Sequence, residues 1–177
     1  VTLLLFSGGC NFRMRYIIFS DSHGMSGNMR TAIKRNLVPG AGLDGMLFCG
    51  DGFDGAKLVA KDFDIPFIGI HGNCDQSSVP GKSDPAEVLA ELAGHKTMLI
   101  HGHRHYVTDS TDFAENRARK AGAEVLLFGH THIRYERYVN NLYIFNPGSI
   151  ALPRDGRPSF GILELHGNDI LLSHGTI

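Results

Sequence analysis

The stretch FGHTHIR, residues 128–134, places two histidines two positions apart, directly after the apolar run Val125–Phe128. In an extended strand, residues i and i+2 point to the same side, so His130 and His132 can direct two imidazoles toward one point. Such a pair is typical of a metal site, although a strand-end histidine bonded to the backbone is the ordinary alternative for either residue alone. The stretch therefore predicts a buried strand that ends in a candidate metal-binding loop.

The global composition limits the class of protein. A chain of 177 residues predicts one globular domain with a sizeable core. Hydrophobic residues make up 42%, charged residues 20%, and the formal net charge is −1, so we expect neither a disordered chain nor strong nucleic-acid binding. No apolar run approaches the roughly 20 residues of a membrane span. We therefore expect no membrane association. The three cysteines match no disulfide framework, which favours a reducing compartment, so we expect a cytoplasmic location.

The first thirteen residues, VTLLLFSGGCNFR, contain an apolar block too short for a secretory signal and no basic region before it. A lipid-attachment cysteine at Cys10 is the alternative. Residues 15–20 read as a first strand that needs nothing before it. We therefore expect residues 1–13 to be a disordered N-terminal extension and residues 14–177 to form a single domain.

Strand-length apolar runs recur along the chain, and the early ones are mostly separated by helix-length stretches, which is typical of a mixed α/β protein. After Ile133 the turns become short, which favours antiparallel strands. Residues 85–95 fit a helix or a strand, and we favour a strand pair that turns at Ala93–Gly94. The expected strands are residues 16–20, 45–49, 67–71, 97–101, 124–128, 135–139, 142–145, 160–165 and 170–173, and the expected helices are residues 28–36 and 109–121.

Polar side chains follow each of the first five expected strands, a set that does not include the ambiguous segment 85–95. Because ligands bind at the carboxyl ends of strands in α/β sheets, we expect these strand ends to converge on one cleft. The donors are carboxylate, amide and imidazole groups, and there are more of them than one divalent ion requires. This favours two ions about 3.5–4 Å apart. The candidate ligands are Asp21, His23, Asp51, Asn73, His101, His130 and His132.

Five motifs occur in the order DSH (21–23), GD (50–51), GNCD (72–75), HGH (101–103) and GHTH (129–132). Together they resemble the calcineurin-like metallophosphoesterase family. With the late NPGS at residues 146–149, the chain is similar to the small bacterial and archaeal phosphodiesterases of the YfcE type. The resemblance covers residues 15 to about 173 and implies an α/β (α+β) fold, a four-layer αββα sandwich with two packed mixed β-sheets. It also implies a metal-dependent hydrolase that acts on a small phosphodiester. We expect NPGS to form a turn that supports the cleft.

The resemblance also implies roles for single residues. One ion would be held by Asp21, His23, Asp51 and His132, and the other by Asp51, Asn73, His101 and His130, so that Asp51 bridges the two. A hydroxide between the ions would attack phosphorus in line. Asn73 can also donate its amide N–H to the phosphate. The expected metal is Mn²⁺, with Fe, Zn or Ni as alternatives, whereas Mg²⁺ prefers oxygen ligands.

The general acid stays open in the sequence. Cys74 stands where the wider family has a histidine suited to protonating the leaving group, and a thiol with an ordinary pKa near 8.5 is an imperfect substitute. His103 and Asp75 are the candidate acids, although a good leaving group needs little help. Asn73, Cys74 and Arg104 are the expected substrate contacts, with a solvated exposed side chain as the alternative for Arg104.

Two other functions remain open. A subunit of the retromer coat has this fold and serves as an interaction scaffold, so the fold alone does not establish an activity. A phosphomonoesterase or nucleotidase would differ only in its substrate. The complete set of ligands favours an enzyme, because a scaffold does not need it. A homo-oligomer is expected by analogy only.

Overall fold

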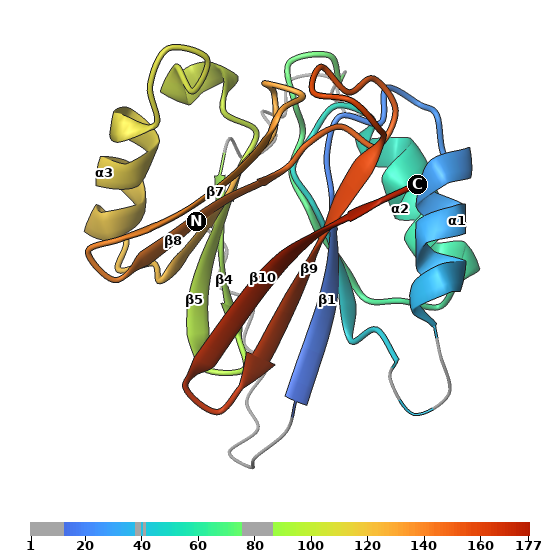
Figure 1. The fold of residues 1–177 in the computed structure, drawn as a ribbon, viewed down its shortest axis with the longest axis horizontal. Helices are drawn as coiled ribbons and strands as arrows, with labels where there is room; N and C mark the ends of the chain where they lie inside the picture. The colour runs from blue at the N-terminus through green and yellow to red at the C-terminus, as the bar shows by residue number, and fades with distance from the viewer. Residues whose placement is uncertain (1–12, 38–39, 41, 76–86) are drawn as a thin grey trace, which may run out of the picture.

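Two five-stranded mixed β-sheets pack face to face in the computed structural model, which describes residues 13–37, 40, 42–75 and 87–177 (Figure 1). The first sheet has the strand order β10-β9-β1-β2-β3, in which β1 pairs with β2 in parallel and with β9 antiparallel. Its strands are β1 (Arg13–Phe19), β2 (Gly45–Phe48), β3 (Phe67–Gly69), β9 (Ser159–His166) and β10 (Asp169–Thr176).

The second sheet has the order β4-β5-β6-β8-β7, in which β5, β6 and β8 are parallel and the two outer strands are antiparallel to their neighbours. Its strands are β4 (Glu87–Leu92), β5 (His95–Ile100), β6 (Val125–Leu127), β7 (Arg134–Val139) and β8 (Leu142–Pro147).

Helices cover the outer face of each sheet and complete four layers (Figure 1). Helices α1 (Gly27–Asn36) and α2 (Phe53–Asp62) pack on the first sheet, and α3 (Asp112–Lys120) packs on the second. A short 3₁₀ helix, η1 (His103–His105), follows β5. No helix among the described residues is long and apolar enough to cross a membrane.

The second half of strand β1, residues 16–19, is apolar and buried, whereas its first half contains Arg13 and Arg15. Successive side chains of a strand point to opposite faces. Tyr16 and Ile18 accordingly lie in the core between the two sheets, while Ile17 and Phe19 pack under α1 and α2. Both faces of residues 16–19 are therefore buried. The polar residues that follow the strand, Ser20 and Asp21, are buried as well.

Most expected strands and helices are confirmed within a few residues, including the strand pair favoured for residues 85–95. Residues 87–92 form β4, and the chain turns at Ala93 (φ 49°) and Gly94 (φ 88°) into β5. Residues 85–86 lie outside the described residues, as does the expected extension up to residue 12. Arg13, assigned to that extension, instead belongs to β1 and pairs with His166. Helix α2 was not expected.

The two packed mixed sheets that the resemblance implies are confirmed. The early strands do not share a single sheet, since β1, β2 and β3 belong to the first sheet and β5 and β6 to the second. The late strands do form antiparallel hairpins, but β7–β8 joins the second sheet and β9–β10 joins the first. The carboxyl ends of the early strands nevertheless converge, because both sheets present them at the same edge of the sandwich.

Candidate metal centre

The candidate ligands occupy the loops that leave the carboxyl ends of β1, β2, β3, β5 and β6. Five of them have left-handed backbone conformations, with φ values of 53° (Asp21), 45° (His23), 62° (Asp51), 70° (His130) and 60° (His132). This conformation costs a residue other than glycine about 1–2 kcal/mol. Backbone strain of this kind persists where the surrounding structure holds a functional geometry.

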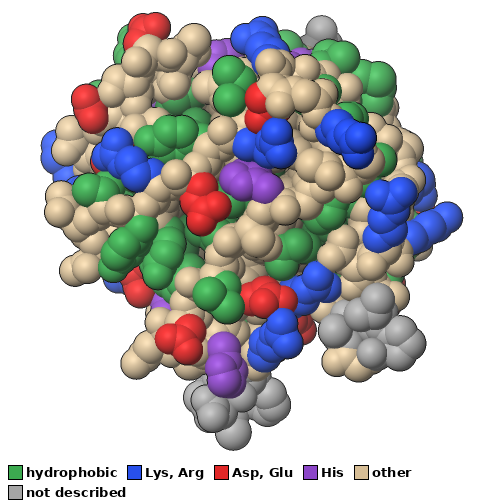
Figure 2. Space-filling view, in the orientation of Figure 1, with side chains coloured by type: hydrophobic (Ala, Val, Ile, Leu, Met, Phe, Trp, Pro, Cys, Tyr) green, Lys and Arg blue, Asp and Glu red, His purple; other side chains and the backbone are tan. Residues whose placement is uncertain are grey.

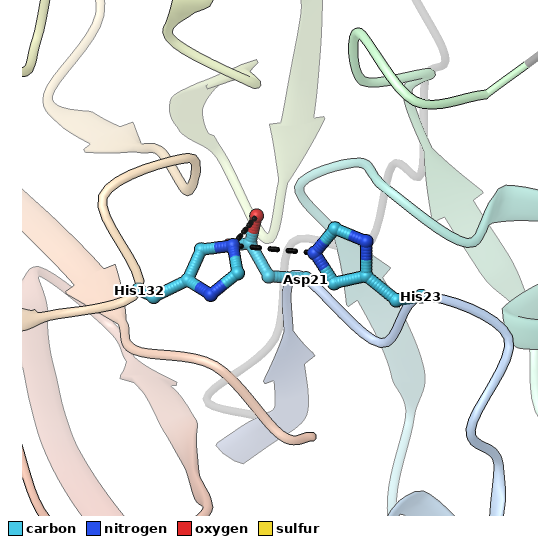
Figure 3. Close-up of side chains that lie close together, drawn as sticks. All are labelled: Asp21, His23 and His132. Carbon is cyan, nitrogen blue, oxygen red and sulfur yellow. Dashed lines mark hydrogen bonds and ion pairs between the residues drawn. The ribbon is translucent and has the colours of Figure 1, made fainter. Parts of the chain in front are cut away.

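Asp21, His23 and His132 form the first group of ligand atoms (Figure 3). Nε2 of His132 lies 3.3 Å from Oδ1 of Asp21 and 3.2 Å from Nε2 of His23. Nδ1 of His132 donates to the Leu152 carbonyl at 2.7 Å, so its Nε2 carries the free lone pair. The potential ligand atoms of the three residues all lie within 4.8 Å of one another, a spacing that one ion could draw together.

Asp21, Asp51 and His101 form the second group, which is buried. Nε2 of His101 lies 3.5 Å from Oδ2 of Asp51 and 3.1 Å from Oδ1 of Asn73. Nδ1 of His101 donates to the Cys49 carbonyl at 2.7 Å, which again leaves Nε2 for a metal. Asp51 also lies 3.9 Å from Nε2 of His23 and therefore stands between the two groups.

His130 is less closely placed than the other expected ligands. It belongs to none of the three close groups of candidate ligands among the described residues. Its ring centroid is 5.0 Å from that of His101, and its backbone N–H donates to both carboxylate oxygens of Asp21, at 3.2 and 3.0 Å. All seven expected ligands thus line one site, with His130 at its border.

Cys74 belongs to the third group, with His23 and Asp51. Its backbone N–H donates to Oδ1 of Asp51 at 2.8 Å, and its side chain is exposed. Desolvation and a hydrogen bond to Asp51 raise the pKa of the Cys74 thiol to about 11. The thiol is therefore protonated at neutral pH in the protein without metal.

The electrostatics of the site couple Asp51 to its neighbours. Burial opposes ionisation of Asp51, but His101 and the Cys74 amide outweigh it and hold the pKa of this carboxyl below its ordinary value. Burial lowers the pKa of His101, yet Asp51 and Asp21 prevail and raise it. For His130, burial and the charge of His101 lower the pKa. The site thus favours a carboxylate at Asp51, the form that binds metal.

Asp75 has a different place from the one expected for a general acid. Its carboxylate accepts four backbone N–H groups at 2.7–3.0 Å, from Asp51, Gly52, Phe53 and Gly72. These contacts fix the loop of Asp51 and the start of α2, where a carboxylate also suits the helix dipole. Because both oxygens are committed to the backbone, we do not retain Asp75 as a candidate acid.

His103 and Arg104, the other residues expected near the substrate, lie on η1. The ring centroid of His103 is 5.3 Å from that of His101 and 6.1 Å from that of His130. Burial and the charge of His101 lower the pKa of His103, which favours its neutral form. Arg104 is exposed. The structure thus brings His103 to the border of the site, and Arg104 to the surface of the same turn.

The NPGS turn supports the ligand loops, as expected. The buried Asn146 donates from Nδ2 to the Gly129 carbonyl and to Oγ1 of Thr131, both at 3.0 Å. Ser149 donates to the Asp21 carbonyl at 2.8 Å and accepts the Leu152 N–H at 2.7 Å. The turn therefore braces the loops of Asp21 and His132 together. The contact of His132 with the Leu152 carbonyl has no signature in the sequence, because any residue supplies that oxygen.

The donor set fits divalent transition metals. It combines carboxylate, amide and imidazole groups, and the second nitrogen of both His101 and His132 is held by a backbone carbonyl. A carboxylate shared by two groups of ligands suits two nearby cations, because its charge offsets their repulsion. The arrangement can therefore bind metal and present it to an anionic ligand.

The chain is similar in sequence to a known protein family and to several named relatives. Residues 14–168 match the calcineurin-like phosphoesterase superfamily domain. The chain is 33% identical over 156 residues to the probable metallophosphoesterase YsnB of Bacillus subtilis, covering 88% of this chain and 86% of YsnB. It is 28% identical over 130 residues to the phosphodiesterase YfcE of Escherichia coli K12, covering 68% of this chain and 64% of YfcE, less than two thirds of that relative.

Solved structures share the fold. A predicted phosphoesterase from Streptococcus pneumoniae TIGR4 has a TM-score of 0.75 at 22% identity, covering 93% of this chain and 90% of that chain. Vacuolar protein sorting 29 from Cryptosporidium parvum has a TM-score of 0.72 at 19% identity, covering 94% of this chain and 100% of that chain. These likenesses show the metallophosphoesterase fold, with its two mixed sheets and outer helices.

Proposed function

Since this chain belongs to the calcineurin-like phosphoesterase superfamily, we propose that it is a dinuclear metal-dependent phosphodiesterase of small substrates. The observation that carries the proposal is the position of Asp51, 3.9 Å from Nε2 of His23 and 3.5 Å from Nε2 of His101. The Asp51 carboxylate thus lies close to one histidine of each group. Relatives named as phosphodiesterases support the substrate class.

Each group of residues has a defined task in this proposal. Asp21, His23 and His132 hold one cation, Asn73, His101 and His130 hold the other, and Asp51 contributes to both. When bound, the two cations lower the pKa of water toward neutrality and stabilise charge on the phosphoryl oxygens. These residues would fix where the two cations bind, and the cations would supply the activated water and the positive charge that the phosphoryl group needs.

Other residues act on the substrate side. Asn73 is exposed at the rim, and its Nδ2 lies 3.4 Å from Sγ of Cys74, from where it can turn to a phosphoryl oxygen. The Cys74 thiol and the His103 imidazole are two groups at the site that can carry a proton near the leaving group. Neither is a strong acid, which favours a diester with a stable leaving anion over a substrate that requires protonation.

Manganese is the proposed metal, with iron, zinc and nickel as alternatives that the donor set also accepts. We further propose a cytoplasmic location, because the described cysteines, Cys49 and Cys74, are both free thiols and suit a reducing compartment. A homo-oligomer remains a proposal by analogy. On the face in Figure 2, basic and acidic side chains both occur, which agrees with a small substrate rather than a long polyanion.

The test is hydrolysis of bis(4-nitrophenyl) phosphate and 4-nitrophenyl phosphate by metal-stripped protein to which Mn²⁺, Zn²⁺, Fe²⁺ or Ni²⁺ is restored. Bound metal is counted on the same samples. We expect two ions per chain and cleavage of the diester in preference to the monoester. Faster cleavage of the monoester would favour a phosphomonoesterase. Two bound ions without turnover of either substrate would favour the interaction scaffold, and protein that binds no metal would overturn the proposal.

A further inference from the structure

Two exposed aromatic side chains lie in the segment that follows β5, the strand that leads directly to His101. Tyr106 and Phe113 remain 67% and 57% exposed, and their rings form a T-shaped pair with centroids 6.3 Å apart. Phe113 is the second residue of α3, whose buried side chains are those of Ala114, Glu115 and Ala118. Phe113 therefore points away from the core, and the pair is open to a ligand.

The position of the pair connects it to the site. The ring of His103, the first residue of η1, is 5.3 Å from His101, and Tyr106 directly follows η1. The N–H of Val107, the next residue, turns back to the Gly102 carbonyl at 3.5 Å, so Tyr106 stays within one tight turn of the chain after His101. Figure 1 shows the turn between β5 and α3 at the edge where the strands end. In this position the two rings would meet an ester group that extends from a phosphoryl group at the metal centre toward η1.

The turn holds Tyr106 in a fixed and unfavourable conformation. Tyr106 has φ 54°, a left-handed value that is rare for a bulky residue. The turn is closed by the His105 N–H, which donates to the Gly102 carbonyl at 2.9 Å. The buried Val107 fills the space where a Cβ on Gly102 would lie, only 2.5 Å away. The core gains nothing from an exposed ring at Tyr106, and strain of this kind points to a function.

The same turn also carries a positive charge. Arg104 is exposed one residue after His103. A guanidinium and aromatic rings on one short segment are groups that suit phosphate esters of planar groups, since the cation attracts the phosphate and a ring stacks on the plane. We propose that Tyr106 and Phe113 bind a planar aromatic ester group of the phosphodiester substrate. The inference rests on the proposed function and narrows its substrate class.

The test compares three diesters that share the 4-nitrophenolate leaving group and differ in the ester group that is retained. The retained groups are methyl, phenyl and 5′-adenosyl. Because the leaving group is constant, differences in kcat/KM report binding of the retained group. We expect the wild type to prefer at least one of the aromatic esters over the methyl ester by roughly 10-fold, as one stacked ring provides. Preference for adenosyl indicates a nucleotide source, and preference for phenyl indicates an aryl ester.

The variants Tyr106→Ala and Phe113→Ala should each remove most of that preference and leave hydrolysis of the methyl ester within about twofold of the wild type. Tyr106→Phe keeps the aromatic ring and should therefore retain the preference for the aromatic ester that Tyr106→Ala loses. Tyr138→Ala is the matched control, because Tyr138 is also 57% exposed but lies toward the far end of β7. It should change none of the three rates.

A second measurement separates this inference from the proposed function. Binding of diphenyl phosphate and dimethyl phosphate to the metal-loaded protein is measured by calorimetry, whether or not the diesters are hydrolysed. Binding of diphenyl phosphate that is tighter and that weakens in both alanine variants supports the aromatic pair, even if no diester is cleaved. Equal binding of the two ligands, or binding that the variants do not change, overturns the inference even if the enzyme is active.

Discussion

A Cβ atom placed on Gly72 would lie 2.0 Å from Oδ1 of Asp51 and 2.6 Å from its backbone nitrogen. The loop after β3 therefore crosses directly over the carboxylate that stands between the two groups of ligands. Such distances leave no room for any side chain, and the nearest atoms belong to backbone and to a buried carboxylate that cannot move aside.

Gly72→Ala should therefore displace Asp51 and disable the site. We expect a loss of metal affinity and of diesterase kcat/KM of at least roughly 10- to 100-fold, the range seen when groups that hold metal ligands are disturbed. The matched control is Gly55→Ala within α2, where the nearest atom to a new Cβ is 4.0 Å away. Gly55→Ala should raise the free energy of unfolding by about 0.5–1 kcal/mol and leave activity unchanged. Full metal occupancy in Gly72→Ala would contradict the packing of this loop.

Asp51→Asn tests the shared carboxylate itself. The amide is nearly the same size but carries no charge, so both groups of ligands lose the anion between them. We expect fewer than two bound ions per chain and a loss of activity above roughly 100-fold. Metal content and turnover are measured on one sample. Asp169→Asn, at an exposed position on β10, is the control and should retain both. Two bound ions with normal turnover in Asp51→Asn would exclude the bridging role.

Asn146→Ala tests the brace behind the ligand loops. The substitution leaves the Gly129 carbonyl and the Gly148 N–H without the partner that the amide supplies. We expect a loss of about 2–4 kcal/mol in the free energy of unfolding, measured in denaturant, together with weaker metal binding.

Ser159→Ala separates stability from metal binding in that experiment. Ser159 is buried and donates from its hydroxyl to the Pro147 carbonyl at 2.7 Å and from its backbone N–H to the Ser149 carbonyl at 3.0 Å, neither of which belongs to a candidate ligand. Its loss should lower stability by about 1 kcal/mol and leave metal affinity unchanged. If the two variants weaken metal binding equally, the effect of Asn146 is general destabilisation rather than support of the loops.

The sequence predicted the strand ends well for a physical reason. Each early strand is a short apolar run that stops at a glycine or a polar ligand, so the same residues mark the end of burial and the start of the site. The pairing of strands was not accessible in this way. The ladder of β1 with β9 joins residues about 150 positions apart, and nothing local in either segment specifies the partner.

Helix α2 shows a second limit of the sequence. Its N-cap is Gly52 with φ 117°, and it has no capping side chain of its own. The first backbone N–H groups are capped by Asp75, which is 22 residues beyond Phe53. A start signal supplied from that distance is invisible to local rules for helix ends. For the same reason the sequence did not reveal that Asp75 caps this helix. Its position in the GNCD motif suggested a general acid instead.

The pH dependence of stability provides the last prediction, centred on His105. This side chain is only 6% exposed, and its Nε2 lies 3.8 Å from Oε2 of Glu87, which also pairs with Arg117. Burial lowers the pKa of His105, and the attraction of Glu87 only partly offsets it. In the unfolded chain the imidazole has its ordinary pKa of about 6.5. As the pH falls below that value, the unfolded state takes up the proton first, so stability decreases until the pH passes the lower pKa of the folded state.

His105→Leu removes this titration and keeps a buried apolar side chain. We expect the free energy of unfolding of the metal-stripped wild type to fall more steeply between pH 7 and pH 5 than that of the variant. The difference in slope can reach at most about 1.4 kcal/mol per pH unit, the value for one proton. Urea titrations at several pH values provide the measurement, with chelator present so that metal binding does not contribute. Parallel pH profiles for the two proteins would show that His105 accepts its proton equally well in the folded and unfolded states, and a steeper profile for the variant would reverse the sign argued from burial.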